Sequence, residues 1–213
     1  MAVNPDTRHS NENTLYLACS GGGKSQAVRQ NRAIPYRGAR VLLWDIDEDH
    51  RAHRFDNLDH YRRAVIAGIR SGQGFRLAYT GPDTVEAFEL WCRIAWAALD
   101  GRTKTFCIIE ELADVSPSVA KATPEFGRLL RKGRKFGAKL HITSQRGAEI
   151  PKTAYTQCPI KWIGQQEGAD VAKMAAIAGV GPEQISALKP LQFYRKEAGP
   201  EPGRLVRLKY KPK

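Results

Sequence analysis

Residues 15–25 read Leu15-Tyr16-Leu17-Ala18-Cys19-Ser20-Gly21-Gly22-Gly23-Lys24-Ser25, and this stretch decides the fold. A short apolar run leads into three glycines, a lysine and a serine, as in a strand that ends in a phosphate-binding loop. Glycine lets the backbone curl so that successive N–H groups point at one anion. Lys24 adds a positive charge, and the Ser25 hydroxyl can hold Mg²⁺. Residues 26–30 predict the helix that follows, with its positive N-terminus facing the same phosphates.

The loop predicts a set of contacts to ATP that runs from the end of the strand into the helix. These contacts are Cys19, Ser20, Gly21, Gly22, Gly23, Lys24, Ser25 and Gln26. One position departs from the GxxxxGK[ST] pattern, because Ala18 stands where a glycine is usual. The alternative interpretation is a glycine-rich surface turn that happens to contain Lys-Ser. The strand before the loop and the helix after it favour the phosphate-binding loop.

Length and charge narrow the class of protein. A chain of 213 residues is long enough for one domain with a substantial core. The net charge of +12 attracts polyanions, and nucleic acid is the expected partner. A chain that is basic only for solubility is the alternative. No apolar run could span a bilayer and the polar N-terminus lacks a signal-peptide core, so we expect a soluble cytoplasmic protein without membrane insertion.

The four cysteines lie far apart in the sequence, without CxxC spacing. They are Cys19, Cys92, Cys107 and Cys158. We expect buried, reduced thiols rather than a zinc site or a disulfide framework.

The rest of the chain alternates between apolar runs and helical patterns. Strands are expected over residues 14–20, 39–46, 74–80, 105–109, 139–144 and 161–164. Helices are expected over residues 58–69, 83–99, 124–136 and 169–178, and after Pro182. Residues 193–194 and 205–208 can pair as a terminal hairpin. This alternation predicts an α/β fold with a mostly parallel sheet and helices on both faces. The expected organisation is an N-terminal arm at 1–13, a P-loop domain at 14–208 and a basic tail at 209–213.

A second strand end with candidate functional side chains follows residues 105–109. Four apolar residues followed by Glu110 and Glu111 form a Walker B pattern. Glu110 is expected to hold Mg²⁺, directly or through water, and Glu111 to accept a proton from the attacking water. A strand that ends in a solvated acidic turn is the alternative. The carboxyl ends of parallel strands share one edge, so we expect this pair to face the phosphate loop.

A third strand end contributes Gln145, on the strand expected beside the first one. Gln145 can sense the γ-phosphate or orient water; a solvent-facing polar residue is the alternative. The segment before it is basic, since residues 121–146 hold eight Lys or Arg and one acid. An arginine finger that reaches a neighbouring subunit's γ-phosphate is one interpretation, and a solvated helix face or DNA contact are two others. The candidate fingers are Arg128, Arg131, Arg134 and Arg146.

Two other groups of residues are interpreted as structural. His50 and His53 lie near acidic residues in the segment 47–56, but their spacing matches no known metal site, and a solvated loop explains the composition. The four tryptophans are expected in the core or in an interface rather than as platforms for stacked bases.

Together these residues resemble the FtsK–HerA branch of the P-loop ATPases. Within it they are most similar to the genome-packaging ATPases of tailless, membrane-containing viruses with double-stranded DNA, such as the tectivirus-like phages. The likeness runs from about Thr14 to Leu208 and includes the phosphate loop and Glu110-Glu111. Its most specific element is Gly133-Arg134-Lys135-Phe136-Gly137 before a strand that ends in Gln145-Arg146.

The resemblance implies a RecA-like sheet and a hexameric or pentameric ring of identical subunits. It also implies ATP- and Mg²⁺-dependent movement of double-stranded DNA into a preformed capsid, with capsid or vertex proteins as partners. The expected locations are the cytoplasm of the infected host and the packaging vertex of the virion. Two departures are Ala18 and Glu110, which stands where many relatives carry Asp.

Three rival functions remain open at this stage. A small P-loop nucleotide or metabolite kinase could use residues 128–135 as an arginine-rich lid over the phosphates. A filamentous-phage assembly protein would share the core but usually carries a membrane span. A nucleotide-gated DNA-binding module would bind DNA with negligible turnover.

Overall fold

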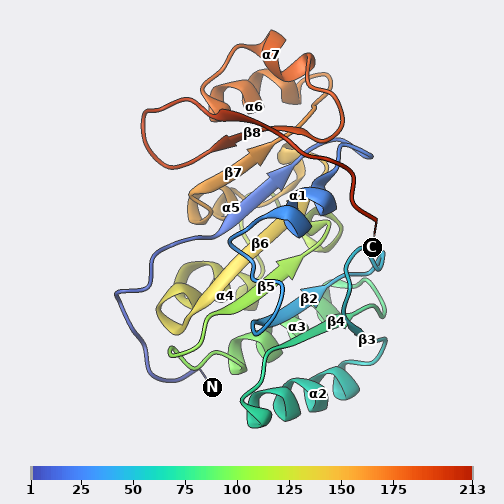
Figure 1. Ribbon diagram of the computed structural model, residues 1–213, viewed down its shortest axis with the longest axis vertical. Helices are drawn as coiled ribbons and strands as arrows, with labels where there is room; N and C mark the ends of the chain where they lie inside the picture. Colours follow the sequence, from blue (N-terminus) through green and yellow to red (C-terminus); the bar gives the residue numbers. More distant parts are fainter. Residues whose placement is uncertain (1, 213) are drawn as a thin grey trace.

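One continuous sheet forms the centre of the computed structural model, which describes residues 2–212 (Figure 1). The strand order is β3-β4-β2-β5-β6-β1-β7-β8-β9. The neighbours from β3 to β7 pair in parallel, and β8 and β9 add to the edge in antiparallel register. The strands are β1 (Thr14–Leu17), β2 (Arg40–Trp44), β3 (His53–Phe55), β4 (Phe75–Tyr79), β5 (Thr105–Ile109), β6 (Ala138–Ser144), β7 (Ile160–Ile163), β8 (Gln192–Lys196) and β9 (Arg204–Arg207).

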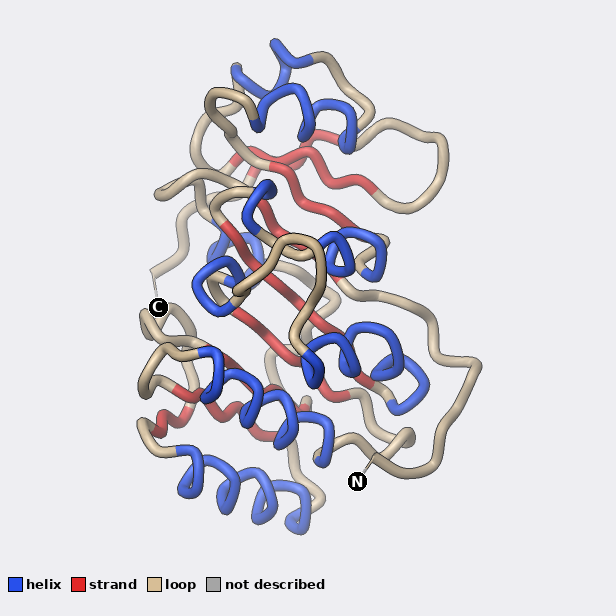
Figure 2. The backbone as a smooth tube through the Cα atoms, turned by 180° about the vertical axis from the view of Figure 1, so that it is seen from behind, coloured by secondary structure: helices blue, strands red, loops and turns tan. Residues whose placement is uncertain are grey.

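The helices cover the two faces of the sheet unequally. Figure 2 shows α2, α3, α4 and α5 in front of one face, whereas α1 crosses the opposite face (Figure 1). The α-helices are α1 (Lys24–Gln30), α2 (Leu58–Ser71), α3 (Val85–Ala97), α4 (Pro124–Lys132), α5 (Lys152–Gln157), α6 (Asp170–Ala178) and α7 (Pro182–Ser186). Short 3₁₀ helices are η1 (Leu112–Val115), η2 (Gly133–Phe136) and η3 (Gly147–Glu149). Within residues 2–212, no helix has the length and apolar character that crossing a membrane requires.

The central strands are buried on both faces, which explains their continuous apolar sequence. Alternate residues of β2 enter two clusters: Leu42 and Trp44 face α2 and α3, and Val41 and Leu43 lie on the α1 side. Trp44 packs edge-on against Phe88 and Trp91, at centroid distances of 5.2 and 6.3 Å. Each such buried side chain contributes about 2 kcal/mol to folding. The prediction that the tryptophans are structural is confirmed, because all four are buried.

Most predicted elements are present with shifted ends. The basic helix over 124–136 is two helices, because Gly133 follows α4 and the turn tightens into η2. The thiols of Cys92, Cys107 and Cys158 are buried, and all four cysteines are reduced. The interpretation of residues 47–56 as a solvated loop holds for most of the segment, of which six residues are exposed. It misses the edge strand β3 and His50, which is buried beneath the carboxyl edge of the sheet.

The N-terminal arm is tied to the amino edge of the sheet. The Asp6 N–H donates to the Lys135 carbonyl at 2.6 Å, and the Arg134 guanidinium donates to the carbonyls of Thr7 and His9. Buried Lys139 pairs with Glu12 at 2.9 Å. These contacts attach the arm along much of its described length. The outer ends of the predicted arm and tail, Met1 and Lys213, lie outside the described residues, and the division of the chain at 13 and 208 stays a prediction.

Candidate functional site

The phosphate loop turns sharply between β1 and α1. Gly21 and Gly23 have φ values of +70° and +96°, which only glycine adopts readily. Ala18 is fully buried, and a Cβ on Gly22 or Gly164 would come within 2.8 Å of its methyl group. The alanine that departs from the usual pattern is therefore accommodated by glycines on two neighbouring segments. The Leu191 N–H braces the loop by donating to the Gly22 carbonyl at 3.0 Å.

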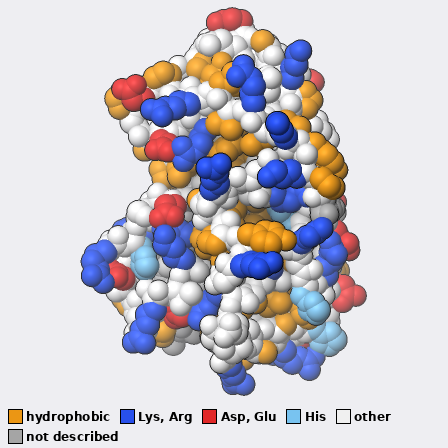
Figure 3. All heavy atoms as spheres, in the orientation of Figure 1, with side chains coloured by type: hydrophobic (Ala, Val, Ile, Leu, Met, Phe, Trp, Pro, Cys, Tyr) orange, Lys and Arg blue, Asp and Glu red, His pale blue; other side chains and the backbone are white. Residues whose placement is uncertain are grey.

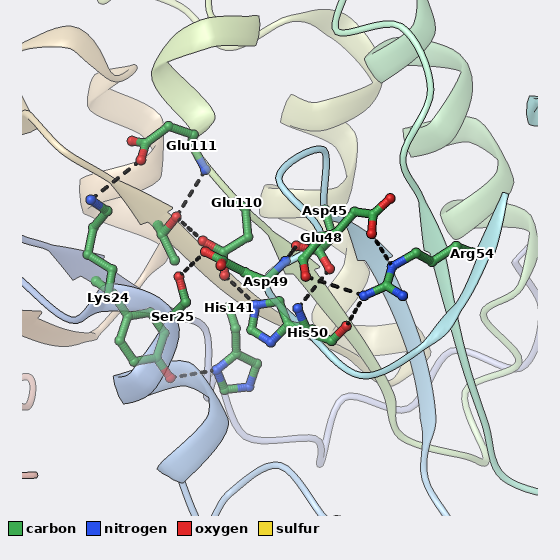
Figure 4. Close-up of polar contacts among 12 residues, drawn as sticks. Lys24, Ser25, Asp45, Glu48, Asp49, His50, Arg54, Glu110, Glu111 and His141 are labelled. Atoms are coloured by element: carbon green, nitrogen blue, oxygen red, sulfur yellow. Dashed lines mark hydrogen bonds and ion pairs between the residues drawn. The ribbon is translucent and has the colours of Figure 1, made fainter. Parts of the chain in front are cut away.

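Lys24 and Glu111 face each other across the carboxyl edge of the sheet (Figure 4). Lys24 Nζ lies 3.5 Å from Glu111 Oε2 and donates to the Ala18 carbonyl at 3.2 Å. The Gln145 N–H donates to Glu111 Oε1 at 2.6 Å, so β6 fixes the carboxylate from the other side. Burial raises the pKa of Glu111, while the charge of Lys24 and the Gln145 N–H oppose that shift. A raised pKa suits a group that has to accept a proton.

The backbone of Glu111 is in an unusual conformation. Its φ is +47°, in the left-handed region that a residue with a long side chain rarely occupies. The Glu111 N–H donates to Thr143 Oγ1 at 3.0 Å, which holds this conformation in place. The strained turn aims the carboxylate at Lys24 rather than along the strand direction. Such outliers concentrate at functional sites.

Glu110 lies deeper and is held by two protein donors. Its Oε1 lies 2.5 Å from His50 Nε2, and its Oε2 accepts from Thr143 Oγ1 at 2.6 Å. His50 is positioned by Asp45, which accepts the backbone N–H groups of Asp49 and His50 at 2.8 and 3.0 Å. The end of β2 therefore shapes the loop that reaches Glu110.

A second carboxylate from the same loop reaches the phosphate loop. Ser25 Oγ donates to Asp49 Oδ2 at 2.5 Å, which leaves the hydroxyl lone pairs available to a cation. Ser25, Glu110 and Asp49 offer only oxygen ligands, the kind that Mg²⁺ prefers. Among residues 2–212 no cluster of His, Cys, Asp and Glu could hold a metal by itself. Mg²⁺ commonly binds through one or two carboxylates together with nucleotide phosphates, so the donor set fits.

These groups line one end of a cavity of about 740 Å³. Its residues are Ser20, Gly21, Gly23, Lys24, Ser25, Gln26, Arg29, Asp47, Asp49, Glu110, Glu111, Gln145, Pro190, Leu191 and Tyr210. Pro190, Leu191 and Tyr210 are the more apolar part of the lining, suited to a base. A volume of this size accommodates a nucleoside triphosphate.

Six of the eight residues predicted to contact the nucleotide line this cavity, and two do not. Cys19 and Gly22 do not line it; the Cys19 thiol lies 3.9 Å from Gln165 Oε1. The Gln26 side chain is engaged elsewhere, because its amide bonds both the N–H and the carbonyl of Lys211, at 3.2 and 2.8 Å. Only the backbone of Gln26 remains available to a phosphate.

Comparison with known proteins decides the family. No family model matches the chain. Protein P9 of Pseudoalteromonas phage PM2 is 35% identical over 194 residues, and the match covers 88% of this chain and 86% of the relative. This chain belongs to the family of Protein P9. The relative is a protein of a phage, in agreement with the resemblance to viral proteins that the sequence predicts.

Solved structures show the same fold at low identity. The genome-packaging NTPase B204 from Sulfolobus turreted icosahedral virus 2, in complex with AMPPCP, has a TM-score of 0.75 and 14% identity, with 94% of this chain and 99% of that chain covered. The plasmid coupling protein TrwB in complex with ADP and Mg²⁺ has a TM-score of 0.68 and 12% identity, covering 97% and 87%. The RecA-like α/β fold of this chain is therefore established.

The four candidate arginines of the chain occupy different environments. Arg128 on α4 lies over the Trp96 ring at 4.2 Å from its centroid, and Arg131 is exposed on the same helix. Arg134 is engaged by the N-terminal arm at the amino edge. Only Arg146 follows a strand end at the carboxyl edge, where it pairs with Glu149 at 2.7 Å and Asp170 at 3.3 Å. Residues 128–135 therefore do not form a lid over the phosphate loop of their own chain.

Several residues of the site were missed by the sequence analysis. Asp49 and His50 were set aside because a metal was the only role considered for the acidic segment. Thr143 was hidden inside a buried strand, and Tyr210 in the basic tail. The acidic segment that begins at Asp45, directly after the buried strand β2, was a usable signal, because parallel strands present their carboxyl ends at one edge.

Proposed function

We propose that this ATPase hydrolyses ATP with Mg²⁺ at the subunit interfaces of a ring and thereby drives double-stranded DNA into a preformed viral capsid. The observation that carries the proposal is the convergence of Lys24, Glu111 and Gln145 at one edge of the sheet, beside the pair of Ser25 and Asp49. The fold shared with the genome-packaging NTPase B204 and the net charge of +12 support a polyanionic cargo.

Each residue has a defined part in the hydrolysis. Gly21, Gly23 and the N-terminus of α1 surround the phosphates with N–H groups, and Lys24 neutralises the β- and γ-phosphates. Ser25 and Glu110 would hold Mg²⁺, with Asp49 orienting the serine hydroxyl. When bound, the metal would neutralise the charge of the phosphates. Lys24 exchanges Glu111 for phosphate oxygens, which leaves the carboxylate to orient water.

Glu111 accepts the proton of the attacking water as the water oxygen bonds to the γ-phosphorus. The bond between that phosphorus and the β,γ-bridging oxygen breaks, and ADP leaves with the electron pair. Gln145 lies at the end of the adjacent strand and responds to the γ-phosphate. His50 and Thr143 keep Glu110 in place while these changes occur.

The substitution Glu111→Gln tests the assigned base. Turnover should fall by a factor of about 10²–10⁴, because a general base typically contributes that much. ATP binding, measured by titration of a fluorescent analogue, should persist because the phosphate loop is unchanged. Turnover at the wild-type rate would remove Glu111 from the mechanism. Glu183→Gln is a matched control, since this exposed glutamate lies outside the cavity.

The ring and the arginine finger are tested by mixing subunits. In a mixed ring, the Glu111→Gln subunit has its arginines but lacks the base. The arginine variant has the base but lacks one arginine, which its Glu111→Gln neighbour can supply. Mixtures should recover activity only if the substituted arginine acts on a neighbour's site, with an effect of about 10³-fold or more for the finger. Each of Arg128, Arg131, Arg134 and Arg146 is substituted by Ala in turn. If no variant is rescued, hydrolysis does not require a neighbour.

DNA separates translocation from phosphate transfer. Duplex DNA should increase phosphate release without any added acceptor. Phosphate transfer to a nucleotide or metabolite, with no effect of DNA, would favour a kinase. Turnover that stays negligible with DNA would favour a nucleotide-gated binding module. The proposed location is the host cytoplasm and the packaging vertex, where capsid or vertex proteins would anchor the ring.

A further inference from the structure

A second cavity lies beside α1, on the side of β2 and β4, with a volume of about 470 Å³. It shares Arg29 with the nucleotide cavity and is otherwise lined by other residues. These are Val28, Gln30, Ile34, Tyr36, His50, Arg51, Arg76, Ile108, Lys211 and Pro212. Nothing in the ATPase chemistry above uses this space. It is closed on one side by the C-terminal tail.

The charge on its wall has one sign. Among the described residues that line the cavity, four are Lys or Arg and none is Asp or Glu. They come from four separate segments: α1, the loop after β2, β4 and the tail. Figure 3 shows the same face of the molecule, with Lys and Arg spread over its middle and most Asp and Glu near its rim. Convergence of like charges from distant segments costs free energy unless an anion binds between them.

One of the arginines has a buried donor without a partner, and another is partly removed from water. Arg29 Nε is buried without a hydrogen-bond partner among the described residues, although an arginine N–H can only donate. Arg76 donates to the Arg51 carbonyl at 3.3 Å, and burial lowers its pKa, as expected for a cation partly removed from water. Buried donors of this kind require an acceptor that a ligand can supply.

The floor of the cavity is apolar. Val28 and Ile108 are almost completely buried, and Ile34 lies beside them. Tyr36 is 72% exposed on the loop between α1 and β2, where its ring is free to lie against a flat ligand. Cations above an apolar, aromatic surface suit a phosphate that carries a sugar and a base. The volume falls in the range of small-molecule sites, about 300–1,000 Å³.

We infer that this cavity binds the phosphate of a nucleotide unit, with Arg29, Arg76 and Lys211 as its ligands and Tyr36 against the sugar or base. The unit is either a free nucleotide or part of a nucleic acid strand, and both offer the same chemistry. The site goes beyond the proposed hydrolysis of ATP, because it lies outside the phosphate loop and contains no candidate base.

The cavity contacts the ATPase site through two residues. His50 lines the cavity and bonds Glu110 at 2.5 Å. Arg29 lines both cavities. An anion bound in this cavity therefore lies next to His50, which positions Glu110, and next to Arg29, which also lines the nucleotide cavity. Through these two residues, binding of the anion can change the rate of hydrolysis.

The tail offers a matched pair of lysines for the test. Lys211 and Lys209 are exposed, and both have their carbonyls held by α1, through Gln26 at 2.8 Å and Gln30 at 2.9 Å. Only Lys211 lines the cavity. Lys211→Gln and Lys209→Gln each remove one charge from the same segment, so a difference between them reports on the cavity alone. Arg76→Gln probes the opposite wall, and its folding is checked by thermal melting.

Two equilibrium titrations without ATP separate the sources of the ligand. The first follows a short fluorescein-labelled DNA duplex by anisotropy. The second follows AMP by calorimetry in chains that also carry Lys24→Ala, which weakens binding at the phosphate loop. Arg76→Gln should lower affinity about tenfold, the effect of one lost charge-assisted hydrogen bond, and Lys211→Gln a few-fold. Lys209→Gln should match the parent chain.

Each outcome decides the proposal. Loss in the duplex titration assigns the site to the nucleic acid backbone, and loss in the AMP titration assigns it to a free nucleotide. If Lys211→Gln and Arg76→Gln behave like Lys209→Gln in both titrations, the cavity binds no nucleotide phosphate and the inference is overturned. Because no ATP is present, a failure of DNA translocation would leave this result unaffected.

Discussion

Each edge of the sheet holds a lysine close to a glutamate, but one pair faces a cavity and the other is enclosed by the protein. At the carboxyl edge, Lys24 and Glu111 face each other at 3.5 Å across an open cavity. At the amino edge, Lys139 contacts Glu12 at 2.9 Å and also donates to the Ser10 carbonyl at 2.7 Å. The comparison teaches that a lysine close to a glutamate says little by itself. An open, incompletely bonded pair can exchange its partner for a ligand, whereas a closed pair contributes to stability.

The largest expected effect follows from removing the lysine of the open pair. Lys24→Ala should lower ATP turnover by a factor of about 10²–10³, the usual consequence of losing one charge that stabilises the transition state. Thermal stability should change little, because Glu111 is still bonded by the Gln145 N–H. Phosphate release and a melting curve on the same sample check both. A large fall in melting temperature with normal turnover would reverse the assignment of the two edges.

Buried His141 on β6 makes the free energy of unfolding depend on pH. Burial lowers its pKa from 6.5 to about 3, so the folded protein keeps it neutral while the unfolded chain binds a proton below pH 6.5. Stability from this group is therefore present above pH 6.5 and is lost as the pH falls toward 3. The loss should reach about 2 kcal/mol near pH 5.

His141→Gln should flatten this part of the curve of unfolding free energy against pH, measured by urea denaturation. Glu12 and Lys139 act on His141 in opposite directions, so both stay unchanged in the comparison. Identical slopes for the two chains would mean that His141 titrates normally in the fold.

Removing the lysine of the closed pair should affect folding and leave chemistry unchanged. Lys139→Met keeps most of the buried stem but leaves Glu12 without its partner. Because Glu12 is partly exposed, the expected cost is about 1–2 kcal/mol. Turnover per folded molecule, measured below the unfolding transition, should equal that of the parent chain. A loss of turnover without a loss of stability would give Lys139 a functional role.

The smallest effect is expected from Arg134 at the amino edge. Arg134→Ala removes the donor to the carbonyls of Thr7 and His9, at a cost of about 1 kcal/mol. Limited proteolysis should then cut the N-terminal arm sooner. Arg146→Ala, at the carboxyl edge, is the control and should leave the arm protected. Equal protection in both variants would mean that Arg134 does not hold the arm.

The amino-acid sequence determined the elements and the central part of the site. Residues 15–25 specified a strand, a glycine turn and a helix, because each local preference agreed with the others. The apolar runs ending in Glu110 and Gln145 specified strand ends that meet at one edge, and β6 does pair with β1. Buried strands and glycine turns are local features, so one chain without relatives was enough to find them.

Tertiary structure decided what the other charged residues do. Sequence patterns placed Arg134 and Arg146 in one basic group, but β6 separates them to opposite edges of the sheet. Asp49, His50 and Tyr210 entered the site because distant segments fold against the phosphate loop, and Gln26 left it to hold the tail. Partners far apart along the chain leave no local pattern. The tertiary structure alone therefore decided which charged side chains are enclosed in ion pairs and which line a cavity where a ligand can bind.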